Sequence, residues 1–241
     1  MKAKNCLFAI LALLICCNMA SAQDIMGGHY KKALIIGAHP DDPETTCGGT
    51  MLMLKEQGCE VVSVYLTRGE RGIGGKTLEE AAAIREAEAL KACEMMGVRA
   101  VFLTQVDGRT EINQERYREM IRLIEEEKPD LIITHWPIDG HRDHRNCASL
   151  VFDAWKQTGR KADLFYAEAM TGHQTLNFIP NSYVDITPVR DLKVQVYLCH
   201  ESQKLGGEVK RYHDAMETMR GCEFDCKYAE AFVKQFWNKN R

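Results

Sequence analysis

Several patterns that point to common functions are missing from this chain of 241 residues. It contains no CxxC pair, which argues against a zinc site built from thiolates. No G-x-G-x-x-G follows its first apolar run, which argues against a dinucleotide site. The net charge of −3 gives no reason to expect nucleic acid or an anionic membrane as a partner. Repeats, low-complexity tracts and long linkers are also missing, which favours a single large domain.

The stretch from Glu70 to Thr77, ERGIGGKT, ends like a phosphate-binding P-loop. A P-loop needs glycine at the position of Glu70, and a carboxylate there would repel phosphate. We therefore interpret this stretch as a flexible substrate loop.

The first residues have the anatomy of a secretory signal peptide. Lys2 and Lys4 precede an apolar run from Leu7 to Cys17, and Ala20-Ser21-Ala22 is a typical cleavage site. The apolar run is too short to span a bilayer comfortably, so no stable membrane anchor is expected. We predict a secreted or periplasmic protein that is cut between Ala22 and Gln23. Residues 1–22 are then removed, and residues 23–241 form a single domain.

The cysteines do not indicate a catalytic or metal-binding role. Three of the ten cysteines lie within residues 1–22, so seven remain after cleavage. Cys59, Cys93 and Cys199 stand in apolar patterns and are interpreted as small core residues. Cys222 and Cys226 are the closest pair, and their spacing is compatible with a disulfide, with a helix or with a short loop.

From Lys32 onward, short β-branched runs alternate with longer helical patterns. Strands are predicted at residues 32–36, 61–66, 98–103, 131–134, 164–169 and 183–186. Helices are predicted at residues 48–57, 77–96, 111–127, 144–157, 187–201 and 208–218. The alternation predicts an α/β fold with a Rossmann-like, mostly parallel sheet flanked by helices. With the strand order 3-2-1-4-5, the carboxyl ends of strands 1 and 4 meet at the switch point where ligands bind.

Histidine and carboxylate clusters follow both of these strands. The first is Gly37-Ala38-His39-Pro40-Asp41-Asp42-Pro43-Glu44, and the second is Gly140-His141-Arg142-Asp143-His144. Each cluster alone can be a solvated turn, but charge of this density after a buried strand is costly unless a cation compensates it. A catalytic zinc-like ion takes three nitrogen or oxygen ligands and leaves one position open. The first cluster offers His39 and Asp42, and the second offers His141 or His144.

The remaining residues of the clusters supply what amide hydrolysis needs. Asp41 lies beside the expected ligands and can take a proton from water and return it to a leaving amine. If His144 is the ligand, His141 is free to donate to a developing oxyanion. Asp143 can then orient that imidazole, or it can cap the helix that starts near His144.

These two clusters resemble the motifs of the PIG-L/LmbE-like zinc-dependent N-deacetylases. Further similar motifs follow in order: Thr67-Arg68-Gly69-Glu70, Arg85-Glu86-Ala87-Glu88 and His200-Glu201-Ser202-Gln203. The resemblance covers about Lys32 to Gln203. It implies a sugar substrate that bears an N-acetylated amino group.

The resemblance also implies a role for each site residue. Zinc would be held by His39, Asp42 and His144, although His/Asp sites also accept Fe²⁺ or cobalt. The remaining implied roles are Asp41 as general base, His141 as oxyanion donor, Asp143 as its support, and Glu44, Arg68 and His200 around the sugar pocket.

We therefore expect an exported hydrolase that removes an N-acetyl group from a small molecule or glycan containing N-acetylglucosamine, by attack of a zinc-activated water. Two alternatives stay open: a metal-dependent amidase for a non-sugar acyl amide, and a zinc- or carbohydrate-binding module without turnover. The presence of Asp41 and His141 beside the ligands favours an enzyme, because binding alone needs neither a base nor an oxyanion donor.

Overall fold

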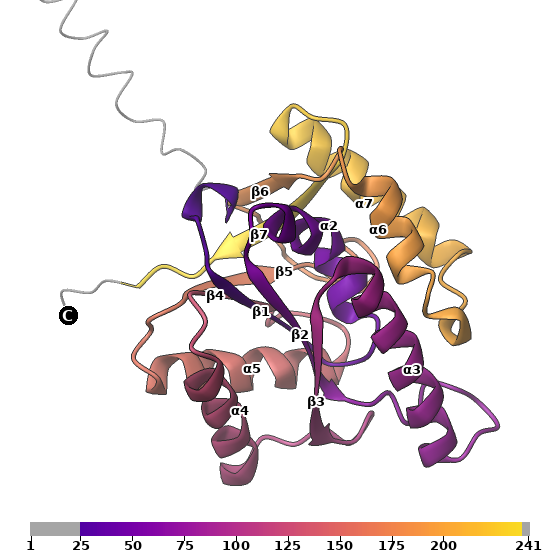
Figure 1. The fold of residues 1–241 in the computed structure, drawn as a ribbon. Coiled ribbons are helices and arrows are strands. Elements are labelled where there is room, and N and C mark those ends of the chain that lie inside the picture. Colours follow the sequence, from indigo (N-terminus) through magenta and orange to yellow (C-terminus); the bar gives the residue numbers. More distant parts are fainter. Residues whose placement is uncertain (1–24, 238–241) are drawn as a thin grey trace, which may run out of the picture.

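The computed structural model describes residues 25–237, and its centre is a seven-stranded sheet with helices on both faces (Figure 1). The strand order is β3-β2-β1-β4-β5-β7-β6. Strands β1 to β5 pair in parallel, whereas β7 runs antiparallel to both β5 and β6. The fold is therefore the predicted α/β sheet, extended at one side by an antiparallel pair. The predicted signal peptide lies outside the described residues.

The strands are β1 (Lys32–Gly37), β2 (Glu60–Thr67), β3 (Arg99–Gln105), β4 (Leu131–His135), β5 (Asp163–Ala167), β6 (Ser182–Asp185) and β7 (Ala229–Lys234). The helices are α2 (Asp42–Glu56), α3 (Leu78–Met96), α4 (Gln114–Glu127), α5 (Arg142–Gln157), α6 (Arg190–Tyr197) and α7 (Glu208–Phe224), with short 3₁₀ turns η1 (Ile25–Gly28) and η2 (Glu201–Gln203).

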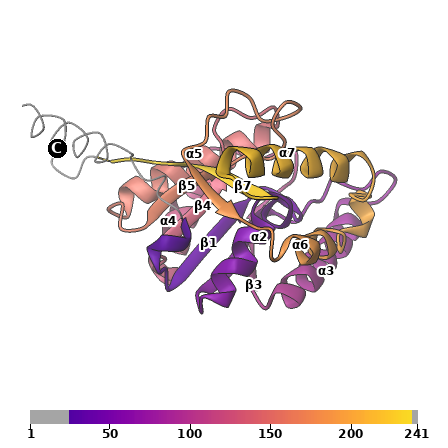
Figure 2. The ribbon, with the colours of Figure 1, turned by 90° about the horizontal axis from the view of Figure 1, so that it is seen from above.

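Strand β1 is buried on both faces because helices cover both sides of the sheet. Helices α4 and α5 lie on one face, and α2, α3 and α6 lie on the other (Figures 1 and 2). Successive side chains of a strand point to opposite faces. Accordingly, Ala33 and Ile35 pack in the core beneath α2, whereas Leu34 and Ile36 pack beneath α4 and α5. A strand that is buried on both faces has a continuous apolar sequence, as β1 does.

Helix α2 begins at Asp42, six residues before the start predicted at Gly48. Pro43 fits the first turn of a helix, where no backbone N–H is needed. The two glycines at the predicted start, Gly48 and Gly49, lie inside the helix and permit close packing. A Cβ at Gly48 would lie 3.1 Å from Lys193 Cγ, and one at Gly49 would lie 2.5 Å from Ile186 Cγ2.

The second half of the chain departs further from the prediction. The helix predicted at residues 187–201 is shorter and is followed by the separate turn η2. Strand β7 was not predicted at all, although it lies between β5 and β6. Its sequence AEAFVK places Glu230, Phe232 and Lys234 on one face, so the strand lacks a clean alternation of apolar and polar residues.

Two further features bear on the sequence analysis. Cys59, Cys93 and Cys199 are buried as predicted, and Cys222 and Cys226 are both free thiols. Between residues 25 and 237, none of the helices combines the length and the apolar character that a bilayer crossing needs.

Candidate active site

The first half of the site is the tight turn between β1 and α2. The Asp42 carboxylate accepts hydrogen bonds from the backbone N–H groups of Ala38 and His39, at 3.0 and 2.7 Å. A Cβ at Gly37 would lie 2.7 Å from Asp42 Cβ, so this turn requires glycine. Asp41 has a φ of 117°, which is rare for a residue with a side chain. The turn thus presents His39, Asp41 and Asp42 at the carboxyl end of β1.

The second half lies between β4 and α5. His141 is the N-cap of α5, and its Nδ1 accepts a hydrogen bond from the Asp143 backbone N–H at 3.2 Å. His144 lies in the first turn of the same helix. Because β1 and β4 are neighbours, His144 Nε2 lies 3.2 Å from Asp42 Oδ1. The structure therefore brings the two clusters together, as the strand order predicted.

The donor atoms gathered here suit a divalent cation. Asp42 is central, because its other carboxylate oxygen lies 3.2 Å from His39 Nδ1. Three groups of three residues can each offer one ligand atom per residue, and within each group these atoms lie within 4.8 Å of one another. These groups are His39/His141/His144, Asp42/His135/His144 and His39/Asp107/Asp143. A buried set of imidazoles and carboxylates fits zinc or a similar ion, and the ligand set His39, Asp42 and His144 stays a prediction.

The electrostatics of the cluster also favour a cation. Burial lowers the pKa of His144, but the carboxylates of Asp42 and Asp139 outweigh burial and raise that pKa to about 9. Burial likewise opposes a proton on His39, yet hydrogen bonds to three carboxylates raise its pKa well above the usual value. The site therefore holds positive charge on its imidazoles when no other cation is bound, and a divalent ion can replace those protons.

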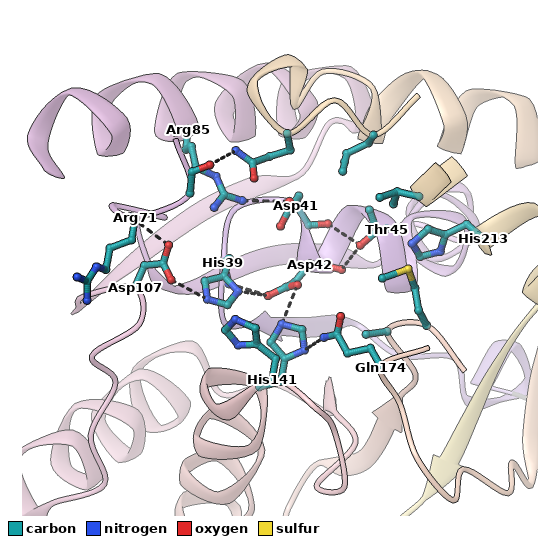
Figure 3. Close-up of a pocket in the computed structure, with 17 residues that line it drawn as sticks. His39, Asp41, Asp42, Thr45, Arg71, Arg85, Asp107, His141, Gln174 and His213 are labelled. Carbon is teal, nitrogen blue, oxygen red and sulfur yellow. Dashed lines mark hydrogen bonds and ion pairs between the residues drawn. The ribbon is translucent and has the colours of Figure 1, made fainter. Parts of the chain in front are cut away.

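Asp41 lies beside this cluster without being part of its donor groups. Its Oδ2 lies 3.0 Å from Arg85 Nη2 (Figure 3). The same nitrogen donates to the Pro40 carbonyl. Burial raises the pKa of the Asp41 carboxyl group, while the Arg85 guanidinium counteracts this rise. A carboxylate of raised pKa is suited to accept and return a proton near neutral pH.

Asp143 is placed differently from the expectation. Its carboxylate lies 3.3 Å from His39 Nε2 and accepts from the Gly108 N–H and the Thr110 hydroxyl, both at 2.7 Å. The carboxylate therefore holds His39 and the turn after β3, whereas Asp143 contacts the His141 imidazole through its backbone N–H. It is also not the cap of α5, because His141 has that position.

The three residues expected around the sugar do not line the pocket. Glu44 and His200 are fully buried and face each other, with Glu44 Oε2 3.4 Å from His200 Nε2. Glu44 also accepts a hydrogen bond from the Tyr65 hydroxyl at 2.5 Å. Arg68 Nε donates to Glu86 at 2.7 Å. These positions do not support direct contact with a substrate.

Several residues of the site were not predicted from the sequence. Asp139 and Gln174 lie 3.3 and 2.9 Å from His144 Nδ1, so they hold the ring with Nε2 toward Asp42. His135, the last residue of β4, stacks on His144 with 3.8 Å between ring centroids. Asp139 stands two residues before His141, so its proximity in sequence was a usable signal. Gln174 lies in an irregular loop and gave none.

A cavity of about 430 Å³ opens over the cluster, within the range of small-molecule sites. Asp41, His39 and His141 line its floor, and Arg71 and His213 lie at opposite ends (Figure 3). His213 was not predicted as a site residue, but it lines this cavity.

The fold and the site together define an α/β protein with a candidate metal centre at the switch point of its sheet. Residues 34–155 match the PIG-L family, described as GlcNAc-PI de-N-acetylase, and the chain belongs to this family. The family assignment made from the motifs is thereby confirmed, and with it a place among deacetylases.

Individual relatives agree with this assignment. The chain is 32% identical over 188 residues to a diacetylchitobiose deacetylase of Thermococcus kodakarensis, covering 72% of this chain and 70% of the relative. Among solved structures, the N,N'-diacetylchitobiose deacetylase of Pyrococcus horikoshii superposes with a TM-score of 0.79 at 23% identity, covering 90% of this chain and 87% of the other. A 4-carboxy-2-hydroxymuconate hydratase of Pseudomonas putida KT2440 superposes with a TM-score of 0.76 at 22% identity, covering 88% and 98%. At these identities the two structures are evidence of the fold alone.

Proposed function

We propose that this protein is an exported, metal-dependent hydrolase that removes the N-acetyl group from a substrate containing N-acetylglucosamine. The observation that carries the proposal is the half-buried Asp41 carboxylate, which lines the pocket beside a His/Asp cluster suited to a divalent ion. The family description and the Thermococcus relative both name deacetylation of such compounds, which supports the substrate class.

The residues around the pocket can carry the steps of amide hydrolysis. Asp41 takes a proton from the attacking water, whose oxygen forms a bond to the acetyl carbon. His141 is exposed on the pocket side and can donate to the carbonyl oxygen as negative charge develops there. The C–N bond then breaks, and Asp41 returns its proton to the leaving amine, so acetate and a free amino sugar result.

The metal is proposed to be zinc, held by His39, Asp42 and His144. When bound, such an ion supplies Lewis-acid chemistry, which lowers the pKa of water and polarises a carbonyl. Gln174 contacts His144 Nδ1, and His135 stacks on the same ring and contacts Asp42. Asp42 in turn contacts both His39 and His144.

One experiment tests the proposal: acetate release from N-acetylglucosamine, from diacetylchitobiose and from a hydroxyl-free N-alkylacetamide. We expect release from the sugars, loss of release after chelation, and its return when zinc is added. Asp41→Asn should lower the rate by about 10²- to 10⁴-fold, because the general base is lost. Asparagine is chosen because its short polar side chain tolerates a positive φ.

The metal content of Asp41→Asn should equal that of the wild type. Full activity of this variant would contradict the assigned base. Release from the simple acetamide alone would favour the amidase alternative, and intact sugar on metal-loaded protein would favour a binding module. Hydration of 4-carboxy-2-hydroxymuconate without acetate release would contradict the proposal and show that the protein is a hydratase, as the Pseudomonas structure is named.

A further inference from the structure

The C-terminal part of the chain forms one end of the pocket, and no motif of the sequence analysis accounts for it. His213 and Val209 lie on α7, Leu205 precedes α7, and Met170 lies in the loop between β5 and β6. Figure 3 shows the His213 ring pointing toward Thr45, at the end of the pocket opposite Arg71. This end, called the His213 end below, shares one cavity with Asp41.

His213 is a buried polar side chain with a ring nitrogen that is unpaired within residues 25–237. It is only 2% exposed, and its Nδ1 has no hydrogen-bond partner among the described residues. A buried polar group without a partner costs free energy, so such a group in a pocket wall is a natural contact for a ligand.

The imidazole is neutral at pH 7. Burial, together with the nearby Lys193 ammonium, lowers the pKa of His213 to about 4. The charged groups that face it neutralise one another: Lys193 lies 2.6 Å from Glu217, and Arg190 lies 2.9 Å from the same carboxylate and also pairs with Asp214. A neutral imidazole has one donor and one acceptor, which suits a hydroxyl or an amide better than an anion.

The neighbours of His213 in the wall are apolar. Met170, Leu205 and Val209 offer surface that can pack against the C–H face of a pyranose ring. An acyl chain would also fit such a surface, but it would leave the imidazole nitrogen without a partner.

We propose that the His213 end is a subsite for a neutral sugar residue of the substrate, with His213 hydrogen-bonded to a hydroxyl or acetamido group of that residue. The proposal rests on the proposed deacetylation of an amino sugar, and it names the class of substrate as a neutral saccharide rather than an anionic conjugate.

The test compares three variants of the metal-loaded protein. His213→Phe keeps the ring volume and removes the hydrogen bond, His213→Gln keeps a donor and an acceptor, and Leu205→Ala removes apolar surface. His173→Phe is the matched control, because His173 is exposed and lies outside the pocket. The measurements are kcat/KM for diacetylchitobiose, kcat/KM for the hydroxyl-free N-alkylacetamide and its N-butyryl analogue, and the calorimetric affinity for the deacetylated disaccharide.

His213→Phe should lower kcat/KM for the disaccharide and the affinity for its product by about tenfold, with the simple acetamide unaffected. His213→Gln should restore most of this loss, and Leu205→Ala should lower saccharide affinity even if the phenylalanine variant fails to fold. His173→Phe should behave as the wild type.

Three outcomes would overturn the subsite: saccharide affinity unchanged in both His213→Phe and Leu205→Ala, no saccharide binding by the wild type, or an altered preference between acetyl and butyryl amides without a change in saccharide affinity. The last would identify an acyl pocket. The binding measurement needs no turnover, so a wild type that binds saccharide but releases no acetate would contradict the proposed function and leave the subsite supported.

Discussion

Arg85 is the residue on which the geometry of the proposed base depends. Its guanidinium is buried and contacts both the Pro40 carbonyl and the Asp41 carboxylate, across a turn in which Asp41 has a φ of 117°. The glycines at 69 and 72 give it room, because a Cβ at Gly72 would lie 2.4 Å from Arg85 Nη1. A backbone conformation of this kind persists only when the surroundings hold it.

We therefore predict that Arg85→Ala lowers kcat by roughly 10²-fold, because a small misplacement of a reacting group has an effect of that size. Arg85→Lys should recover part of the loss, and Gly72→Ala should reproduce it with the guanidinium still present. KM for the sugar and metal content should change little, and both are measured alongside kcat. A large rise in KM at unchanged kcat would show that Arg85 contacts the substrate rather than positioning Asp41.

At the scale of elements, a buried ionic network joins the C-terminal layer to the helix that carries the site. Lys193 on α6 is fully buried, with its Nζ 2.6 Å from Glu217 on α7 and 2.7 Å from Glu230 on β7. The Glu230 carboxylate also accepts from the backbone N–H groups of Gly49 and Thr50 on α2, each at 2.8 Å. The network therefore ties α6, α7 and β7 to α2, whose first turn includes Asp42.

Removing Lys193 would leave the buried Glu230 carboxylate without a cation and the buried Glu217 carboxylate with Arg190 alone. We predict that Lys193→Ala lowers the free energy of unfolding by about 3–5 kcal/mol, measured by denaturant titration. Lys76→Ala is the matched control on an exposed loop and should stay within about 0.5 kcal/mol of the wild type. Equal stability of the two variants would contradict a structural role for the network.

At the scale of the molecule, export is a proposal that rests on the first 22 residues. We predict that the chain expressed with residues 1–22 is recovered outside the cytoplasm, and that the recovered protein begins at Gln23. Cell fractionation and N-terminal sequencing check this, with a chain starting at Gln23 as the control that should stay inside. Recovery of the full-length chain inside the cell would contradict the prediction.

The core of the fold could be predicted from the sequence because its signals are local. The apolar run of β1 and the Gly97 C-cap of α3 are properties of short stretches. The strand order 3-2-1-4-5 is a condition that comes from known doubly wound sheets, and the structure shows this order for β1 to β5. Strand β7 could not be predicted in this way, because its pairing with β5 and β6 is non-local and its sequence carries no clear period.

The same division holds for the site. The sequence by itself determined that His39, Asp41 and Asp42 follow one strand and that His141 and His144 follow another, because each cluster is contiguous in the chain. Only the tertiary structure decided their partners. It placed the Asp143 carboxylate on His39, buried Glu44 and His200 away from the pocket, and brought Arg85 and His213 to it. Contacts of this kind depend on how separate elements pack against one another, so they cannot be predicted from any single stretch of the sequence.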